Sequence, residues 1–137
     1  MNALICLIIL AMFSLEDLTN KKISMPICGF FILIGLLMAI DREGGLGLWI
    51  IYSMIPGALI IAVSIVSKGK IGIGDGLCLI ISSLLLGTGT GIFSFFLSLV
   101  LASVIGEALI LMHRIKKGGS LPFVPFLFVG TAVSLMI

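Results

Sequence analysis

The sequence predicts an all-α integral membrane protein, built as a bundle of about six transmembrane helices in a single domain over residues 1–137. The chain is 61% hydrophobic, with 10% charged residues and a mean hydropathy of +1.41. Soluble domains contain roughly 45–50% apolar and about 25% charged residues. A chain of this size could not bury so much apolar surface in water. We therefore expect a lipid environment, and basic loops that alternate with apolar segments support the same class.

The first three apolar segments have lengths near the roughly 17–25 residues that cross a bilayer. The first covers about 2–18 and runs into the sequence SLEDL. The second covers about 25–40, and the third covers about 46–66. Because Pro56 lies inside the third, we expect a kink there.

The last three segments cover about 74–87, 91–112 and 121–137. The fourth segment is the shortest of the six. A segment this short needs a thinned or water-filled neighbourhood at one end. We therefore expect the fourth helix to begin beside water rather than in the bilayer centre.

The basic residues predict how the helices are oriented. Seven of the eight Lys and Arg residues lie in alternate loops, namely Lys21, Lys22, Lys68, Lys70, Arg114, Lys116 and Lys117. Alternate loops share one side of the membrane, and the positive-inside rule places that side in the cytoplasm. We therefore expect a multi-pass protein of the cytoplasmic (inner) membrane with both termini outside.

Two aspartates fall at the same depth in this topology. Asp17 lies near the cytoplasmic end of the first segment, and Asp75 lies near the cytoplasmic start of the fourth. Two carboxyl groups that approach closely share a proton, and such a pair can act as general base and general acid. Glu16 and Asp17 point about 100° apart on a helix. The residues alone do not decide which of these two acids faces Asp75.

Glycines surround Asp75 at positions 72, 74 and 76. Gly72, Gly74 and Gly76 carry no side chain, so a helix or an extended peptide can approach closely. The alternative is that Asp75 only caps the start of a helix, because Asp is common at that position. Spacing alone favours this structural interpretation slightly.

The remaining reactive residues predict neither a metal site nor a cofactor. The three cysteines, Cys6, Cys28 and Cys78, have no CxxC spacing and suit helix packing. His113 is the single histidine and lies at a membrane end, which gives little support to a Ser-His triad or a zinc hydrolase. Glu107 lies deep in the fifth segment, where it either packs between helices or lines a cavity.

Three stretches resemble the type IV prepilin peptidase family. DLTNKKIS, from Asp17 to Ser24, resembles the family's first aspartate motif. KGKIGIGDGL contains a sequence similar to its GxGD motif, from Gly72 to Asp75. LPFVPFLFVG, from Leu121 to Gly130, resembles the proline-rich start of its last helix.

This resemblance implies a membrane-embedded aspartic endopeptidase with a GxGD core. Such enzymes cleave the basic leader peptide from type IV prepilins or pseudopilins on the cytoplasmic side, in pilus assembly and protein secretion. Carried over, the catalytic pair is Asp17 and Asp75, while Pro122 and Pro125 shape the backbone near the site. The carboxylates, including Glu16, are expected to receive the basic leader. The implied partners are a prepilin helix and the lipid bilayer, with no nucleic acid.

The chain departs from the family pattern in places that concern substrate preference. Many members have Ile-Pro-Asn where this chain has Ile23-Ser24-Met25, and many have a lysine where this chain has Leu77. The N-terminal cytoplasmic loop that is linked to methylation in bifunctional members has no counterpart here. We therefore expect the peptidase core alone, without methyltransferase activity.

Two other functions fit a membrane protein that carries buried acids. A small transporter could use the carboxylates to bind ions or relay protons. Inverted repeats, which are common in transporters, are not visible in the sequence. A structural subunit of a secretion machine would tolerate the loss of both aspartates.

Overall fold

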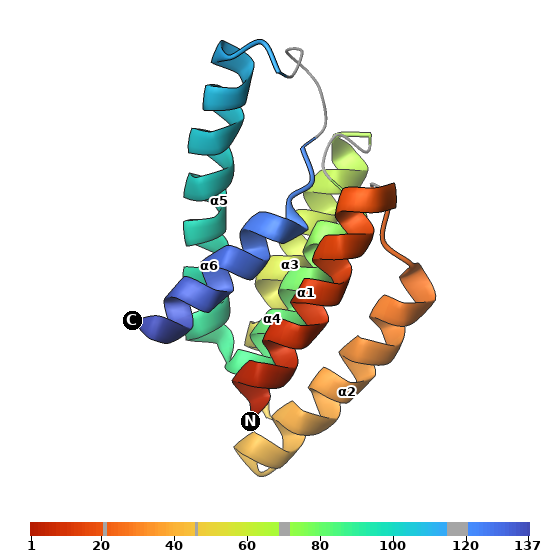
Figure 1. Cartoon of the computed structure of the whole chain (residues 1–137). Helices are drawn as coiled ribbons and strands as arrows, with labels where there is room; N and C mark the ends of the chain where they lie inside the picture. The colour runs from red at the N-terminus through yellow and green to blue at the C-terminus, as the bar shows by residue number, and fades with distance from the viewer. Residues whose placement is uncertain (21, 46, 69–71, 115–120) are drawn as a thin grey trace.

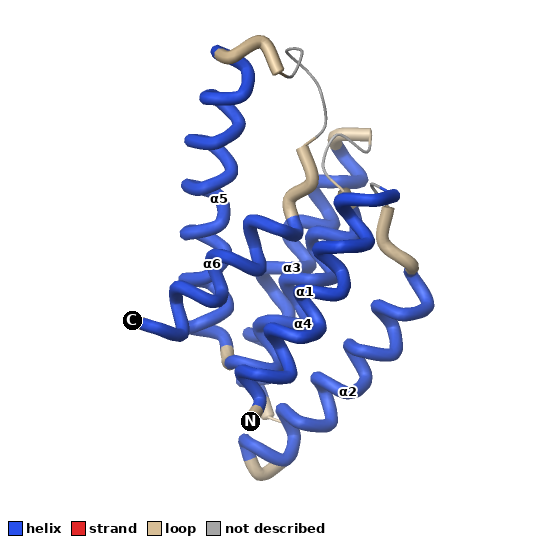
Figure 2. The backbone as a smooth tube through the Cα atoms, viewed as in Figure 1, coloured by secondary structure: helices blue, strands red, loops and turns tan. Residues whose placement is uncertain are grey.

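The computed structural model describes residues 1–20, 22–45, 47–68, 72–114 and 121–137. In these residues the chain forms six α-helices and no strand, as Figures 1 and 2 show, so the predicted all-α class is confirmed. The helices are α1 (Asn2–Asn20), α2 (Met25–Glu43), α3 (Leu48–Val66), α4 (Ile73–Leu86), α5 (Thr88–Leu111) and α6 (Val124–Met136). The predicted loop cations Lys21, Lys70, Lys116 and Lys117 lie outside the described residues, as does Leu46.

Four of these helices, α1, α2, α3 and α5, are long and apolar enough to cross a membrane. The helices α4 and α6 are apolar but shorter, with 14 and 13 residues. At about 1.5 Å per residue, a helix of this length covers only about 20 Å of a hydrocarbon core that is roughly 30 Å thick. The six expected segments are therefore all helical, but only four of the six described helices have spanning length.

Helix α6 begins later than its predicted start at Leu121, with Pro122 before the helix and Pro125 in its first turn. The residue before a proline avoids helical geometry, and Pro122 keeps Leu121 outside the helix. Pro125 lies in the first turn, where a missing N–H costs nothing. The helix starts at Val124, directly before Pro125. Pro56, by contrast, lies inside α3, which continues past it.

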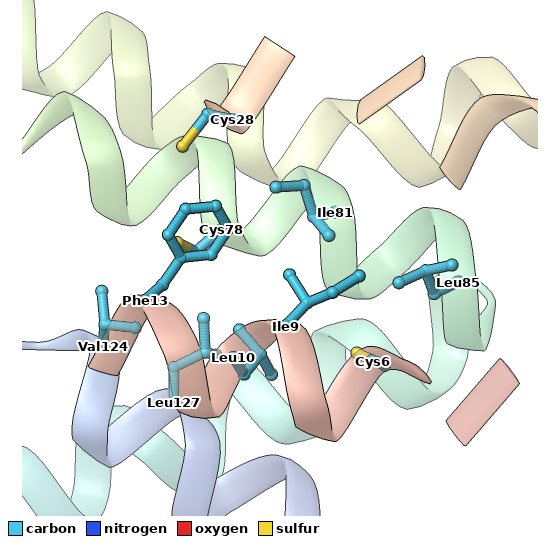
Figure 3. Close-up of a cluster of buried hydrophobic side chains, with 10 residues drawn as sticks. All are labelled: Cys6, Ile9, Leu10, Phe13, Cys28, Cys78, Ile81, Leu85, Val124 and Leu127. Carbon is cyan, nitrogen blue, oxygen red and sulfur yellow. The ribbon is translucent and has the colours of Figure 1, made fainter. Parts of the chain in front are cut away.

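The centre of the bundle is α4, which packs against α1, α2, α3 and α5. Residues 78–85 of this helix are all buried. Figure 3 shows Cys78 and Ile81 of α4 beside Phe13 of α1 in one apolar cluster. The remaining members of this cluster are Cys6, Ile9, Leu10, Cys28, Leu85, Val124 and Leu127.

Arg42 fixes the end of α4 that lies away from Asp75. Its Nη1 donates hydrogen bonds to the carbonyl oxygens of Leu85 (3.1 Å) and Leu84 (3.4 Å). The last carbonyl groups of a helix have no partner within that helix. A guanidinium from α2 therefore satisfies the C-terminal end of α4 and ties the two helices together.

Glycine lets α3 and α4 approach through their backbones. A Cβ atom placed on Gly57 would lie 2.6 Å from the carbonyl oxygen of Gly76, and one placed on Gly76 would lie 2.9 Å from that of Gly57. Small residues at such crossings are typical of membrane helix pairs. The same pattern joins α4 to α5, where Gly91 lies against Ser83.

We expect Gly57→Val to weaken the bundle, because its side chain meets backbone atoms that cannot move aside. Overpacking of this kind costs about 1–3 kcal/mol. Thermal unfolding in detergent should show a lowered midpoint. Gly29→Val on α2 is the matched control, since nothing lies within 4 Å of a Cβ at Gly29. Equal midpoints for the two variants would contradict the packing role.

Candidate active site

Asp17 is a buried carboxylate at the end of α1, with 7% of its surface exposed. Its Oδ2 accepts a hydrogen bond of 3.3 Å from the backbone N–H of Val124, the first residue of α6. The N–H groups of a first helical turn lack partners within the helix and carry partial positive charge. The start of α6 therefore supplies the polar contact that a buried acid requires.

Asp75 lies in the first turn of α4 and is half-buried. Its carboxyl group interacts with the backbone N–H of Gly72, the N-cap residue, while its own N–H donates to the Gly72 carbonyl oxygen at 3.2 Å. An acid at this position that reaches back to the N-cap N–H is one half of a capping box. The N-cap residue is thus Gly72, so the interpretation of Asp75 as the capping residue is wrong, although its carboxyl group interacts with the N-cap N–H.

The structure brings these two carboxyl groups together. Asp17 lies close enough to Asp75 to interact with it electrostatically, and both interact in the same way with the Cys78 thiol. A helix cap alone does not need a second buried acid beside it. Because two adjacent carboxylates cannot both ionise cheaply, the pair can hold one proton between them and serve as acid and base.

Glu16 faces a different neighbour. Its Oε1 accepts a hydrogen bond of 2.7 Å from the Ser24 hydroxyl, in the segment between α1 and α2. Glu16 also interacts electrostatically with Cys28. The choice between Glu16 and Asp17, which the residues alone left open, is thus made by tertiary structure. Asp17 interacts electrostatically with the second aspartate, whereas Glu16 hydrogen-bonds to Ser24.

The three glycines around Asp75 have separate roles. A Cβ on Gly72 would lie 3.2 Å from Oδ2 of Asp75, so this glycine leaves room for the carboxyl group. Gly74 lies against Ile23, where a Cβ would come within 2.7 Å of Cδ1, and Gly76 forms the contact with α3. Gly76 therefore lets a second helix approach, as we predicted, whereas Gly74 packs against Ile23; access for a peptide stays a prediction.

Sequence reasoning missed two features of this site. The Val124 N–H carries no side-chain signature, and the only hint of it was the nearby Pro125, which marks a helix start. The thiols of Cys28 and Cys78 hydrogen-bond to each other across α2 and α4, although no local spacing pairs them. Both thiols belong to the cluster in Figure 3.

Pro122 and Pro125 flank the start of α6 and lie within two residues of Val124, whose N–H donates to Asp17, so both are neighbours of the site. His113 is exposed just after α5, and Glu107 is exposed on α5 itself, so Glu107 is not packed between helices. Among the described residues, no group of three or more His, Cys, Asp or Glu side chains could hold a metal ion.

Comparison with protein-family models matches residues 4–107 to the type IV leader peptidase family. This chain belongs to that family. The match includes both aspartates and five of the six described helices. Searches of curated proteins and of solved structures find no match. Family membership makes this leader peptidase homologue a membrane-embedded protease at the family level, and its expected partners are a prepilin-type substrate and the bilayer.

We expect Gly72→Ala to reduce peptide cleavage while the fold is retained. Its backbone angles, φ −69° and ψ 133°, suit alanine, but the added methyl group would displace the Asp75 carboxyl. A misplacement of a few tenths of an ångström should lower kcat about tenfold, given that ~1 Å can cost about a hundredfold. Gly89→Ala, with nothing within 4 Å, is the control. Wild-type kcat in Gly72→Ala would show that the carboxyl position is unimportant.

Proposed function

We propose that this protein is an aspartic endopeptidase that removes the basic leader peptide from type IV prepilins or prepilin-like proteins at the cytoplasmic face of the inner membrane. The observation that carries the proposal is the electrostatic contact between Asp17 and Asp75, which come from distant parts of the chain. Each carboxyl group also contacts a backbone N–H at the start of a helix. Membership of the leader peptidase family supports peptide hydrolysis as the reaction.

The proposed reaction uses one water molecule and one shared proton. The ionised aspartate takes a proton from water as the oxygen attacks the scissile carbonyl carbon, and the protonated aspartate donates to the carbonyl oxygen. The tetrahedral intermediate then collapses, the C–N bond breaks, and the leaving amine takes a proton from the pair. Rigid helix ends hold both carboxyl groups in position, so little reorganisation is required.

The arrangement of charge supports a cytoplasmic site. Asp17 lies near the C-terminal end of α1, and Asp75 lies in the first turn of α4. The described cations Lys22, Lys68 and Arg114 follow α1, α3 and α5 in sequence and are exposed. In Figure 1 the ends of these three helices lie on one side of the bundle, while the α2–α3 connection lies on the other. The positive-inside rule favours the cytoplasm for the aspartate side.

Removing either aspartate should abolish leader cleavage. We expect Asp17→Asn and Asp75→Asn each to lower kcat/KM by about a thousandfold or more, because an amide neither accepts a proton from water nor shares one with its partner. The assay follows conversion of a purified prepilin in detergent or proteoliposomes. Asp41→Asn, which removes an exposed carboxylate at the far end of α2, should keep full activity.

Complete processing by either active-site variant would rule out the aspartate pair. The transporter alternative predicts instead a cation-dependent flux in proteoliposomes without any cleavage product. Both measurements can be made on one preparation.

The orientation can be tested with single cysteines in a background where the three native cysteines are replaced. We expect Asp41→Cys to react with a membrane-impermeant maleimide in intact spheroplasts. Lys22→Cys and Lys68→Cys should react only after permeabilisation, because the proposed topology places both in the cytoplasm. All three positions are exposed, so burial does not confound labelling. The reverse pattern would place the aspartates outside.

A further inference from the structure

One broad face of the C-terminal half of α5 is left uncovered by the other described helices. Its N-terminal half packs closely, with Gly91 against Ser83 of α4 and with Ser98 against Gly130 of α6. Beyond this point the consecutive residues Ser103, Val104 and Ile105 are all exposed. Three consecutive helical positions sweep about 200° of the helix surface. Figure 1 shows this half of α5 rising away from α6.

Glu107 is an unusual residue for such a surface. It is exposed on a stripe that is otherwise apolar, formed at helical spacing by Phe96, Val100, Val104 and Leu111. Among the described residues, nothing forms a hydrogen bond or salt bridge with its carboxylate. A lone acid on a lipid-facing stripe is costly, and the nearby C-terminal end of the helix dipole disfavours a negative charge further. Its presence therefore points to a cationic partner.

A different, buried face of the same turn of α5 contacts the segment that leads into α6. A Cβ on Gly106, next to Glu107, would lie 3.0 Å from Cδ1 of Leu121. Leu121 lies three residues before Val124, and the N–H of Val124 donates to Asp17. A helix seated along α5 would thus have its cytoplasmic end close to the segment that positions Asp17.

We propose that Phe96, Val100, Val104, Glu107 and Leu111 form a docking face for the transmembrane helix of the substrate, with Glu107 paired to a cation of the leader peptide. This inference rests on the proposed function. The apolar positions match an apolar helix, and the charge is opposite to that of a basic leader. The exposed cations Lys22, Lys68 and Arg114 would repel such a leader, so an acid on the docking face supplies the attraction that the loops lack.

The first test separates binding from chemistry. For Glu107→Gln, we expect KM for a prepilin with a basic leader to rise about fivefold at low ionic strength, because an exposed ion pair contributes about that much to binding. We expect kcat to stay within a factor of two of the wild-type value. A substrate whose leader lysines are replaced by glutamine should show no difference between wild type and variant. Asp41→Asn is again the matched control. An unchanged KM, or an equal loss with the neutral leader, would overturn the proposal.

Charge reversal provides a stricter test of the pair. Glu107→Lys should process a basic leader poorly, and a leader lysine changed to glutamate should recover part of the loss. The interaction energy is read from a double-mutant cycle, which cancels the effect of the other enzyme cations on the substrate. Additive effects of the two changes would exclude direct pairing.

Cross-linking tests docking independently of cleavage. A photoreactive amino acid at Val104, in an Asp75→Asn background, should form an adduct with the prepilin, whereas one at Leu33, an exposed position on α2, should not. Adducts with a second copy of this chain, or with lipid only, would refute the docking face. The cross-link forms without hydrolysis, so docking and cleavage are tested separately. If the adduct forms but the wild-type enzyme does not cleave the prepilin, the proposed reaction is wrong and the docking face is still supported.

Discussion

The hydrogen bond from the Val124 N–H to the Asp17 carboxylate is the contact on which the site depends. It joins the end of α1 to the start of α6, and the residues that make it are far apart in sequence. A buried acid needs donors, and a helix start has donors without partners, so each group satisfies the other. Asp75 contacts the start of its own helix in a similar way. The candidate site is thus the place where two helix starts and one helix end meet.

This arrangement accounts for the two short helices. If α4 and α6 must both begin at the depth of the aspartates, neither can also fill the whole thickness of the bilayer. The hydrocarbon region around their starts then has to be shielded by protein or reached by water. The central position of α4 provides the shielding, since α1, α2, α3 and α5 all pack against it. Arg42 fixes its other end, so the helix that carries Asp75 is held along its full length.

The sequence was sufficient for most of the fold because hydropathy and loop charge act over whole segments. All six expected segments are helices, and the positions of both aspartates near helix ends followed from those segments. The residue-level contacts needed tertiary structure. Glu16 and Asp17 are alike in sequence, and only the packed structure shows that Asp17 binds the start of α6 and interacts with Asp75 while Glu16 binds Ser24. The packing roles of Gly74 and Gly76 depend on Ile23 and Gly57, which no local pattern connects to them.

The two aspartates also differ in a way that bears on the direction of approach to the proposed reaction centre. Asp17 is buried, and one of its oxygens is occupied by the Val124 N–H. Asp75 is only half-buried and follows Gly72, which is exposed. A peptide that enters between them would therefore meet Asp75 from the open side, with Asp17 behind it. The glycine cap matters here for more than helix geometry, because a side chain at Gly72 would crowd the Asp75 carboxyl group, which the proposed reaction requires to be accessible.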